Sequence, residues 1–235
     1  MDFDVNFDHR LDSQGKDPDT HSPTLRIQHQ LLWSKALPDG TLFQLSQEEN
    51  KYLKHESHLG LFHISSDTIS HSLREQVKMQ PLVKQIPTQQ LDTFQAVGSI
   101  IGARIIFPRN RIGGQATINQ ARGMHGKIND RFDLTLECIR LHYLGLSNPL
   151  QGVLARYASF FKLFKDFPNY VEFFLLEDLV SIDSTEINYF LPHESSFELS
   201  PRPQSVEEYN QYMENSIKFV KARNERIQDW VTRNL

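Results

Sequence analysis

The chain has one cysteine, Cys138, among its 235 residues, and it lacks any long apolar run. A single thiol cannot form an intramolecular disulfide, and this is typical of proteins in a reducing compartment. A membrane-spanning helix needs about 20 consecutive apolar residues, whereas the richest apolar segment, YVEFFLLEDLV, is short and contains three acidic residues. The acidic, polar N-terminus also differs from a signal or transit peptide. We therefore expect a cytoplasmic protein with no membrane contact.

A strong charge of either sign is absent as well. The formal net charge of −4 argues against a generally basic nucleic-acid-binding protein, although it leaves room for a local cationic patch. The hydrophobic fraction of 39% and the 16 phenylalanines indicate a globular chain that buries a sizeable core. We expect a single domain over residues 23–235, preceded by a flexible, turn-rich segment at residues 1–22.

Strand patterns occur in the first half of the chain and helical patterns in the second. LGLFHISSDTI alternates in polarity, and FQAVGSIIGARIIFP, rich in β-branched and aromatic residues, is the clearest predicted strand. Capping residues predict helix starts at Ser22 and Thr117. Helical spacing of apolar residues continues through residues 129–143, 150–180 and 205–234. The predicted fold is α+β, with a small, mostly antiparallel N-terminal sheet packed against a predominantly helical C-terminal half.

The loop after the clearest predicted strand has the composition of an anion-binding site. Two glycines precede a helix N-terminus, where free backbone amides and the positive end of the helix favour phosphate or carboxylate. Arginines around the loop could each hold a phosphate through two parallel hydrogen bonds. The G-x-x-x-x-G-K-[ST] and G-x-G-x-x-G signatures are absent, and an ordinary strand-to-helix turn with surface arginines would give the same pattern. The residues assigned to substrate binding are Arg109, Arg111, Gly113, Gly114, Asn119 and Arg122.

The predicted helix that follows carries acidic residues at helical spacing. Asp133, Glu137 and Arg140 recur at intervals of three and four, so they share a face with Asp130. Three interpretations remain open: a solvated face with a capping acid, an ionic brace between helix and loop, and an acidic cluster that acts as a general base or holds Mg²⁺. For an enzyme, the catalytic residues would be Asp133, Glu137 and Arg140, and no residue is assigned as a metal ligand.

Three weaker patterns favour structural explanations. The segment FVKARNERI is expected to form a solvated basic helix face, and Trp33 is expected in the core rather than stacked on a ligand. One set of histidines matches no zinc-binding spacing, so we expect surface histidines at His55, His58, His63 and His71.

Four phrases of the sequence resemble a family of uncharacterised bacterial proteins of about this size. They are SPTLRIQHQLLWSKALPDG, TINQARGMHGKINDRFDLTLECIRLHYLG, YVEFFLLEDLV and FVKARNERI. The resemblance extends over most of the chain from about Asp17 onward. It implies no activity, cofactor or catalytic residue, but families of this kind are associated with mobile elements and phage–host conflict.

Two classes of function follow from these patterns. The first is an enzyme that acts on a phosphate-bearing substrate, such as a nucleotide, NAD or RNA, in a phage-defence or toxin-type setting. The second is a non-enzymatic interaction module, such as a regulator, antitoxin-like partner or adaptor. It would bind a protein partner or a second copy through the apolar helices at residues 150–180 and 205–234. The sequence assigns no cofactor.

Overall fold

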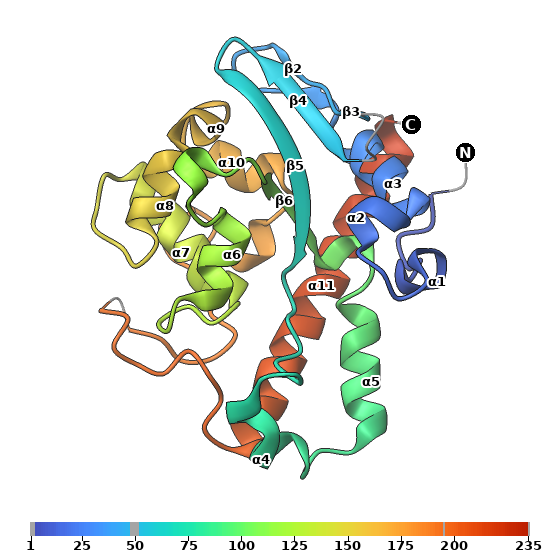
Figure 1. The fold of residues 1–235 in the computed structure, drawn as a ribbon, viewed down its shortest axis with the longest axis vertical. Helices are drawn as coiled ribbons and strands as arrows, with labels where there is room; N and C mark the ends of the chain where they lie inside the picture. Colours follow the sequence, from blue (N-terminus) through green and yellow to red (C-terminus); the bar gives the residue numbers. More distant parts are fainter. Residues whose placement is uncertain (1–2, 48–51, 195, 235) are drawn as a thin grey trace.

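The computed structural model describes residues 3–47, 52–194 and 196–234, and it has the predicted α+β fold (Figure 1). Antiparallel strands lie in the N-terminal half, and the C-terminal half is mostly helical. None of the described helices combines the length and apolarity that crossing a bilayer requires.

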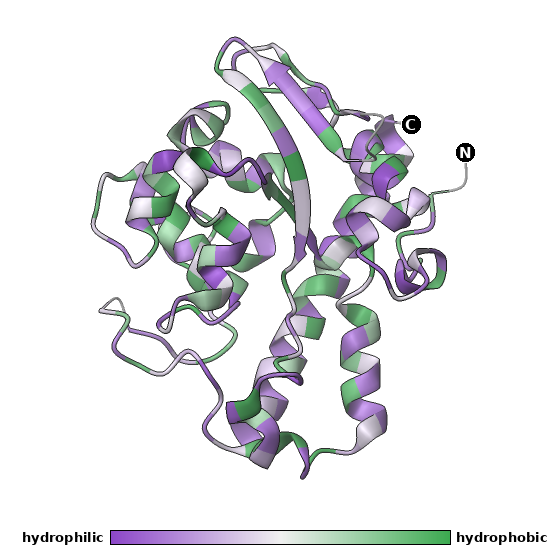
Figure 2. Ribbon diagram, viewed as in Figure 1, coloured by the Kyte–Doolittle hydropathy of each residue, from purple (hydrophilic) through white to green (hydrophobic). Residues whose placement is uncertain are grey.

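Two small antiparallel sheets form the β part of the molecule. The first pairs β1 (Lys35–Ala36) with β2 (Leu42–Phe43). The second has the strand order β3-β4-β5-β6. Its strands are β3 (Ser46–Gln47), β4 (Leu53–Ser57), β5 (Gly60–Thr68) and β6 (Arg104–Pro108). In β5 the buried Phe62 and Ile64 alternate with the less buried His63 and Ser65, as expected for a strand with one face on the core. Figure 2 shows that the strand becomes hydrophilic towards its end.

The helices before β6 include one correction to the sequence prediction. They are α1 (Arg10–Ser13), α2 (Pro18–His21), α3 (Pro23–Trp33), η1 (Val77–Met79), α4 (Gln80–Val83), α5 (Thr88–Val97) and η2 (Ile101–Ala103). The predicted strand FQAVGSIIGARIIFP is therefore wrong in its first part, because Phe94–Val97 ends α5 and only RIIFP forms β6. Leu91 and Phe94, three residues apart in the helix, are both buried. The centres of the Phe94 and Tyr212 rings lie 5.8 Å apart. This helical packing outweighs the local strand preference.

The helices after β6 form a compact lobe and one long helix. They are η3 (Ile112–Gly114), α6 (Ile118–Met124), α7 (Phe132–Tyr143), α8 (Gln151–Arg156), α9 (Ala158–Lys162), α10 (Phe167–Phe173), η4 (Glu177–Leu179) and α11 (Val206–Asn234). α7 begins at Phe132 rather than near Asn129, because Asn129 and Asp130 have left-handed backbone conformations with φ of 49° and 62°. α11 runs past α4 and α5 and ends near α3 (Figure 1).

Local capping signals locate two helix starts correctly. Ser22 Oγ accepts a hydrogen bond from the Leu25 amide at 3.0 Å, and Pro23 occupies the first turn of α3. At α6, Thr117 and Gln120 form the predicted reciprocal capping box. Both helices therefore begin where the sequence places them.

The N-terminal segment packs onto the domain from Phe3 onward, while residues 1–2 of this predicted flexible segment lie outside the described residues. Phe3 and Val5 are buried, and the Asn224 side chain donates a hydrogen bond to the Val5 carbonyl at 3.1 Å. His9 is fully buried, and its amide donates to Ser99 O at 3.1 Å. α11 and the loop before η2 thus hold the beginning of the chain.

Candidate functional site

The arginine at the centre of the predicted site is part of a buried brace. The Arg122 side chain has no exposed surface. It donates hydrogen bonds to Asp67 Oδ2 at 2.6 Å, to the Asp130 carbonyl at 2.7 Å and to Thr135 Oγ1 at 3.2 Å. Arg122 therefore joins β5, α6 and the start of α7, and its donors face protein groups.

The two predicted catalytic carboxylates each have a separate arginine partner. Asp133 is fully buried, pairs with Arg131 and accepts a hydrogen bond from the Phe190 amide at 2.9 Å. Glu137 is 2% exposed and pairs with Arg140 through contacts of 2.7 and 2.8 Å. The structure brings Glu137 and Arg140 together, as the spacing predicts, but it gives neither carboxylate a contact with Arg122.

The predicted phosphate loop lies at the surface, and its residues make separate contacts. The Arg109 guanidinium lies 3.3 Å from the centre of the Tyr52 ring, whereas Arg111 is exposed. Gly113 and Gly114 have φ of 60° and 72° and lie at the surface. Asn119 donates to Ser65 Oγ at 3.2 Å. The α6 terminus behind this loop is already capped by its own side chains.

Three of the structural expectations have clear outcomes. Trp33 is fully buried, so its assignment to the core is confirmed. His55 was expected at the surface, but it is buried and stacks on Phe43, with the two ring centres 4.1 Å apart. Arg223, expected on a solvated face, is buried on the inner side of α11. Among the described residues, no group of three or more His, Cys, Asp or Glu side chains is arranged to hold a metal ion.

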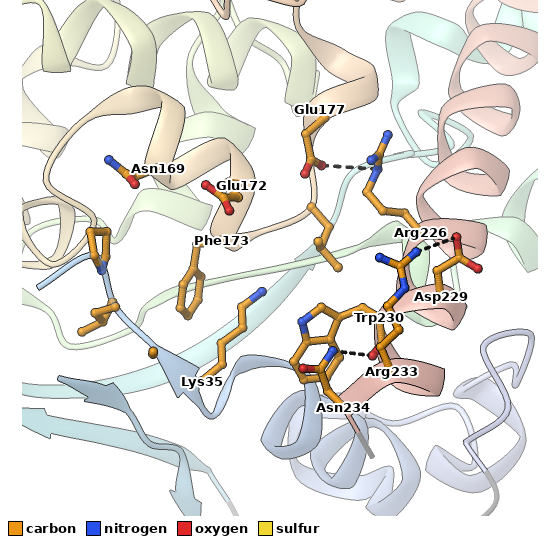
Figure 3. A pocket seen from close by; sticks show the side chains of 14 residues that line it. Lys35, Asn169, Glu172, Phe173, Glu177, Arg226, Asp229, Trp230, Arg233 and Asn234 are labelled. Carbon is orange, nitrogen blue, oxygen red and sulfur yellow. Dashed lines mark hydrogen bonds and ion pairs between the residues drawn. The ribbon is translucent and has the colours of Figure 1, made fainter. Parts of the chain in front are cut away.

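A different part of the molecule contains a cleft suited to a small ligand. Its volume is about 520 Å³, within the range of roughly 300 to 1,000 Å³ common for small-molecule sites. β1, the turn after it, α10, η4 and the C-terminal end of α11 supply its walls (Figure 3). We call it the Lys35 cleft; its polar and aromatic lining residues are Lys35, Asn169, Glu172, Phe173, Glu177, Arg226, Asp229, Trp230, Arg233 and Asn234.

Lys35 is the most unusual side chain in this cleft. Its Nζ atom lies 4.7 Å from the centre of the Phe173 ring, 5.2 Å from that of Trp33 and 5.4 Å from that of Trp230. Within the described part of the chain, Nζ makes these aromatic contacts but no hydrogen bond or ion pair. Burial lowers the pKa of Lys35 to about 8, although the charges of Glu177 and Glu172 oppose this.

Paired charges surround the opening of the cleft. Arg226 Nε lies 3.3 Å from Glu177 Oε2, and Arg233 Nη2 lies 3.7 Å from Asp229 Oδ2 (Figure 3). Burial raises the pKa of Glu177, against the influence of Arg226. Arg233 is 76% exposed, so this arginine is free to reorient towards a ligand.

A second cation, Arg223, lies against the Trp33 ring. Arg223 is fully buried, and its guanidinium lies 5.7 Å from the centre of the Trp33 ring. Among the described residues, it donates to the backbone carbonyls of Phe174, Gly102 and Arg104. Burial lowers its pKa to about 9, because the desolvated guanidinium has no carboxylate hydrogen-bond partner among the described residues. Lys35 on the cleft wall and Arg223 behind Trp33 thus both lack a carboxylate hydrogen-bond partner among the described residues.

The sequence contains little that would have located this cleft. Lys35 stands in a two-residue strand, and its neighbours Phe173 and Trp230 come from distant parts of the chain. Helical spacing places Trp230 on the apolar stripe of α11, which indicates packing rather than a site. The cleft arises from tertiary contacts that no local motif reports.

Comparison with known proteins identifies the family but no function. Neither the curated proteins nor the solved structures contain a match to this chain. A family model matches residues 3–227, nearly the whole chain. The protein therefore belongs to the family of unknown function DUF6994.

Proposed function

We propose that the protein acts on a small organic anion bound in the Lys35 cleft. The observation that carries this proposal is the Lys35 ammonium group, which faces the cleft and has no ion-pair partner among the described residues. An ammonium group removed from water is unfavourable unless a counter-charge compensates it. A carboxylate or phosphate oxygen would supply that charge.

The remaining walls also suit such a ligand. Arg223 behind Trp33 adds positive potential at the deep end, while the rings of Phe173 and Trp230 offer apolar contact to the carbon skeleton. At the rim, Arg233 is exposed, and its acidic partner among the described residues is Asp229 at 3.7 Å. The cleft therefore offers cations and apolar surface to a ligand, beside the carboxylates of Glu172, Glu177 and Asp229.

The phosphate-bearing substrate expected from the sequence belongs to this chemical class, but the proposed binding residues differ. Arg122 is engaged in its brace, so we assign ligand contact to Lys35 and Arg233 instead. The phage-defence setting implied by the resemblance stays a prediction.

The chain provides its own reporter for a binding experiment. Its two tryptophans, Trp33 and Trp230, both lie beside Lys35 Nζ. Titration with lactate, glycerol 3-phosphate or AMP should change the intrinsic fluorescence saturably for at least one of these anions. Lys35→Met should remove the response, whereas Lys221→Met, at an exposed position of α11, should retain it. An unsaturable response, or an equal response from Lys35→Met, would contradict the proposal.

A further inference from the structure

The Lys35 side chain has the geometry of a reactive amine as well as that of a cation. Its Nζ atom faces a cleft large enough for a small molecule, and aromatic rings from α3, α10 and α11 surround it. By contrast, Lys127 Nζ forms an ion pair with Glu198 at 2.7 Å and lies at the surface. Among the described residues, none donates a hydrogen bond to Lys35 Nζ, so the lone pair of a neutral Lys35 amine would be available to a ligand.

We propose that Lys35 forms an imine with the carbonyl carbon of a small anionic aldehyde or 2-oxo acid held in the cleft. This inference rests on the proposed function, since the same cleft must first bind the anion. The ligand's anionic group would lie towards Arg233 at the rim, and its carbonyl carbon would reach Lys35 among the aromatic rings.

The surroundings favour the form of Lys35 that can react. Only a neutral amine has the lone pair needed to attack a carbonyl carbon. Desolvation and the nearby Arg223 disfavour the ammonium form, and the lowered pKa of Lys35 makes the neutral amine accessible near pH 7. Lysines in water remain almost entirely protonated at that pH.

The reaction needs no oxidant or reductant. The Lys35 lone pair forms the new C–N bond while one amine proton passes to the carbonyl oxygen, which gives a neutral carbinolamine. An acid then protonates the hydroxyl group, which leaves as water while the nitrogen lone pair forms the C=N bond, and the remaining amine proton returns to the conjugate base of that acid. Glu177 lines the same cleft, and its raised pKa favours a protonated carboxyl group that can act as this acid.

Reductive trapping tests the inference on the unmodified protein. Pyruvate and sodium cyanoborohydride are added at pH 7, so that hydride from the reagent converts any imine into a stable secondary amine. Peptide mass spectrometry should then find Lys35 modified more than about tenfold faster than the exposed Lys162 and Lys221. Lactate, which lacks the carbonyl group, should give no product.

Variants and binding data separate this inference from the proposed function. Lys35→Arg keeps the positive charge but cannot form the imine, so it should still respond to lactate by fluorescence and should lose the labelled product. If wild-type protein binds pyruvate and lactate but Lys35 is labelled no faster than surface lysines, the imine is overturned and the anion site stands. If no anion alters the fluorescence and no label reaches Lys35, both proposals fail.

Discussion

At the scale of single residues, Lys35 carries a charge that its surroundings disfavour. Its pKa falls from the ordinary 10.5 to about 8 through burial. Between these two values the unfolded chain binds more protons than the folded one, so the free energy of unfolding rises with pH in this window. Below pH 8 both states are protonated, and the folded state bears the full cost of the buried ammonium, at most about 3 kcal/mol.

Replacement of this lysine should therefore stabilise the apo protein. We expect Lys35→Met to raise the free energy of unfolding at pH 7 by about 1 to 3 kcal/mol, because the thioether carries no charge to desolvate. The difference from wild type should shrink as the pH rises from 8 towards 10.5. Urea denaturation across this range measures it, with the exposed Lys221→Met as control. A constant difference at all pH values would show that desolvation of the amine is not the cause.

Arg122 shows the opposite behaviour, because its charge is fully compensated. Arg122→Met should lower the free energy of unfolding by about 3 kcal/mol, since Asp67, Thr135 and the Asp130 carbonyl lose a fully buried hydrogen-bond donor. Arg111→Met, in the exposed loop, should change it by less than about 0.5 kcal/mol. Thermal unfolding compares the two variants. Equal melting temperatures would contradict a stabilising role for Arg122 and make this residue a candidate for ligand contact again.

At the scale of secondary structure, α11 approaches η2 so closely that only glycine fits. A Cβ atom on Gly102 would overlap Asn224 Oδ1 and lie 2.9 Å from the Val220 carbonyl. Gly102→Ala should therefore displace α11 or the Asn224 side chain, at a cost of about 2 kcal/mol.

A second glycine provides the control for this prediction. Gly152 lies in α8, and a Cβ atom added there would meet nothing within 4 Å, so Gly152→Ala should stabilise the protein by up to about 1 kcal/mol. Urea denaturation midpoints should move in opposite directions for the two variants. Midpoints that move together would show that the close approach of α11 does not limit residue size at Gly102.

The elements that the sequence predicts well are those determined by local chemistry. Ser22 and Thr117 accept hydrogen bonds from amides three residues ahead, so a short stretch of sequence contains the whole interaction. The N-terminal part of FQAVGSIIGARIIFP differs, because Phe94 packs on Tyr212 from α11. A pattern within one segment contains no information about such a distant partner, which explains the wrong strand.

The same distinction explains the candidate sites. The Glu137–Arg140 pair is local, with a spacing of three residues, and the sequence predicts it. Arg122 instead meets Asp67 from β5, and Lys35 meets Trp230 from the end of α11. Charge, residue type and spacing identify reactive groups, but only the fold determines which are buried in a brace and which face a cleft.

At the scale of the whole molecule, the apolar helices serve the interior. Phe160, Phe164 and Phe174 are buried in one aromatic cluster, in which the centres of the Phe164 and Phe174 rings lie 5.1 Å apart. Among the described residues, the large hydrophobic side chains that remain exposed come from neither residues 150–180 nor α11. The surplus apolar surface that favoured an interaction module is thus used in folding the single chain.

We therefore expect the protein to be a monomer in solution. Size-exclusion chromatography with light scattering should give the mass of one chain over a wide range of concentrations, because the exposed large hydrophobic side chains among the described residues come from many separate segments. Ile182→Ser, at the most exposed of these positions, should leave the mass unchanged. A mass that rises towards two chains with concentration would restore the second copy as a binding partner. The predicted contact for a second copy includes residues 205–234, and the end of α11 also lines the Lys35 cleft. If a dimer forms through α11, the fluorescence response to ligand should therefore depend on protein concentration as well as on ligand concentration.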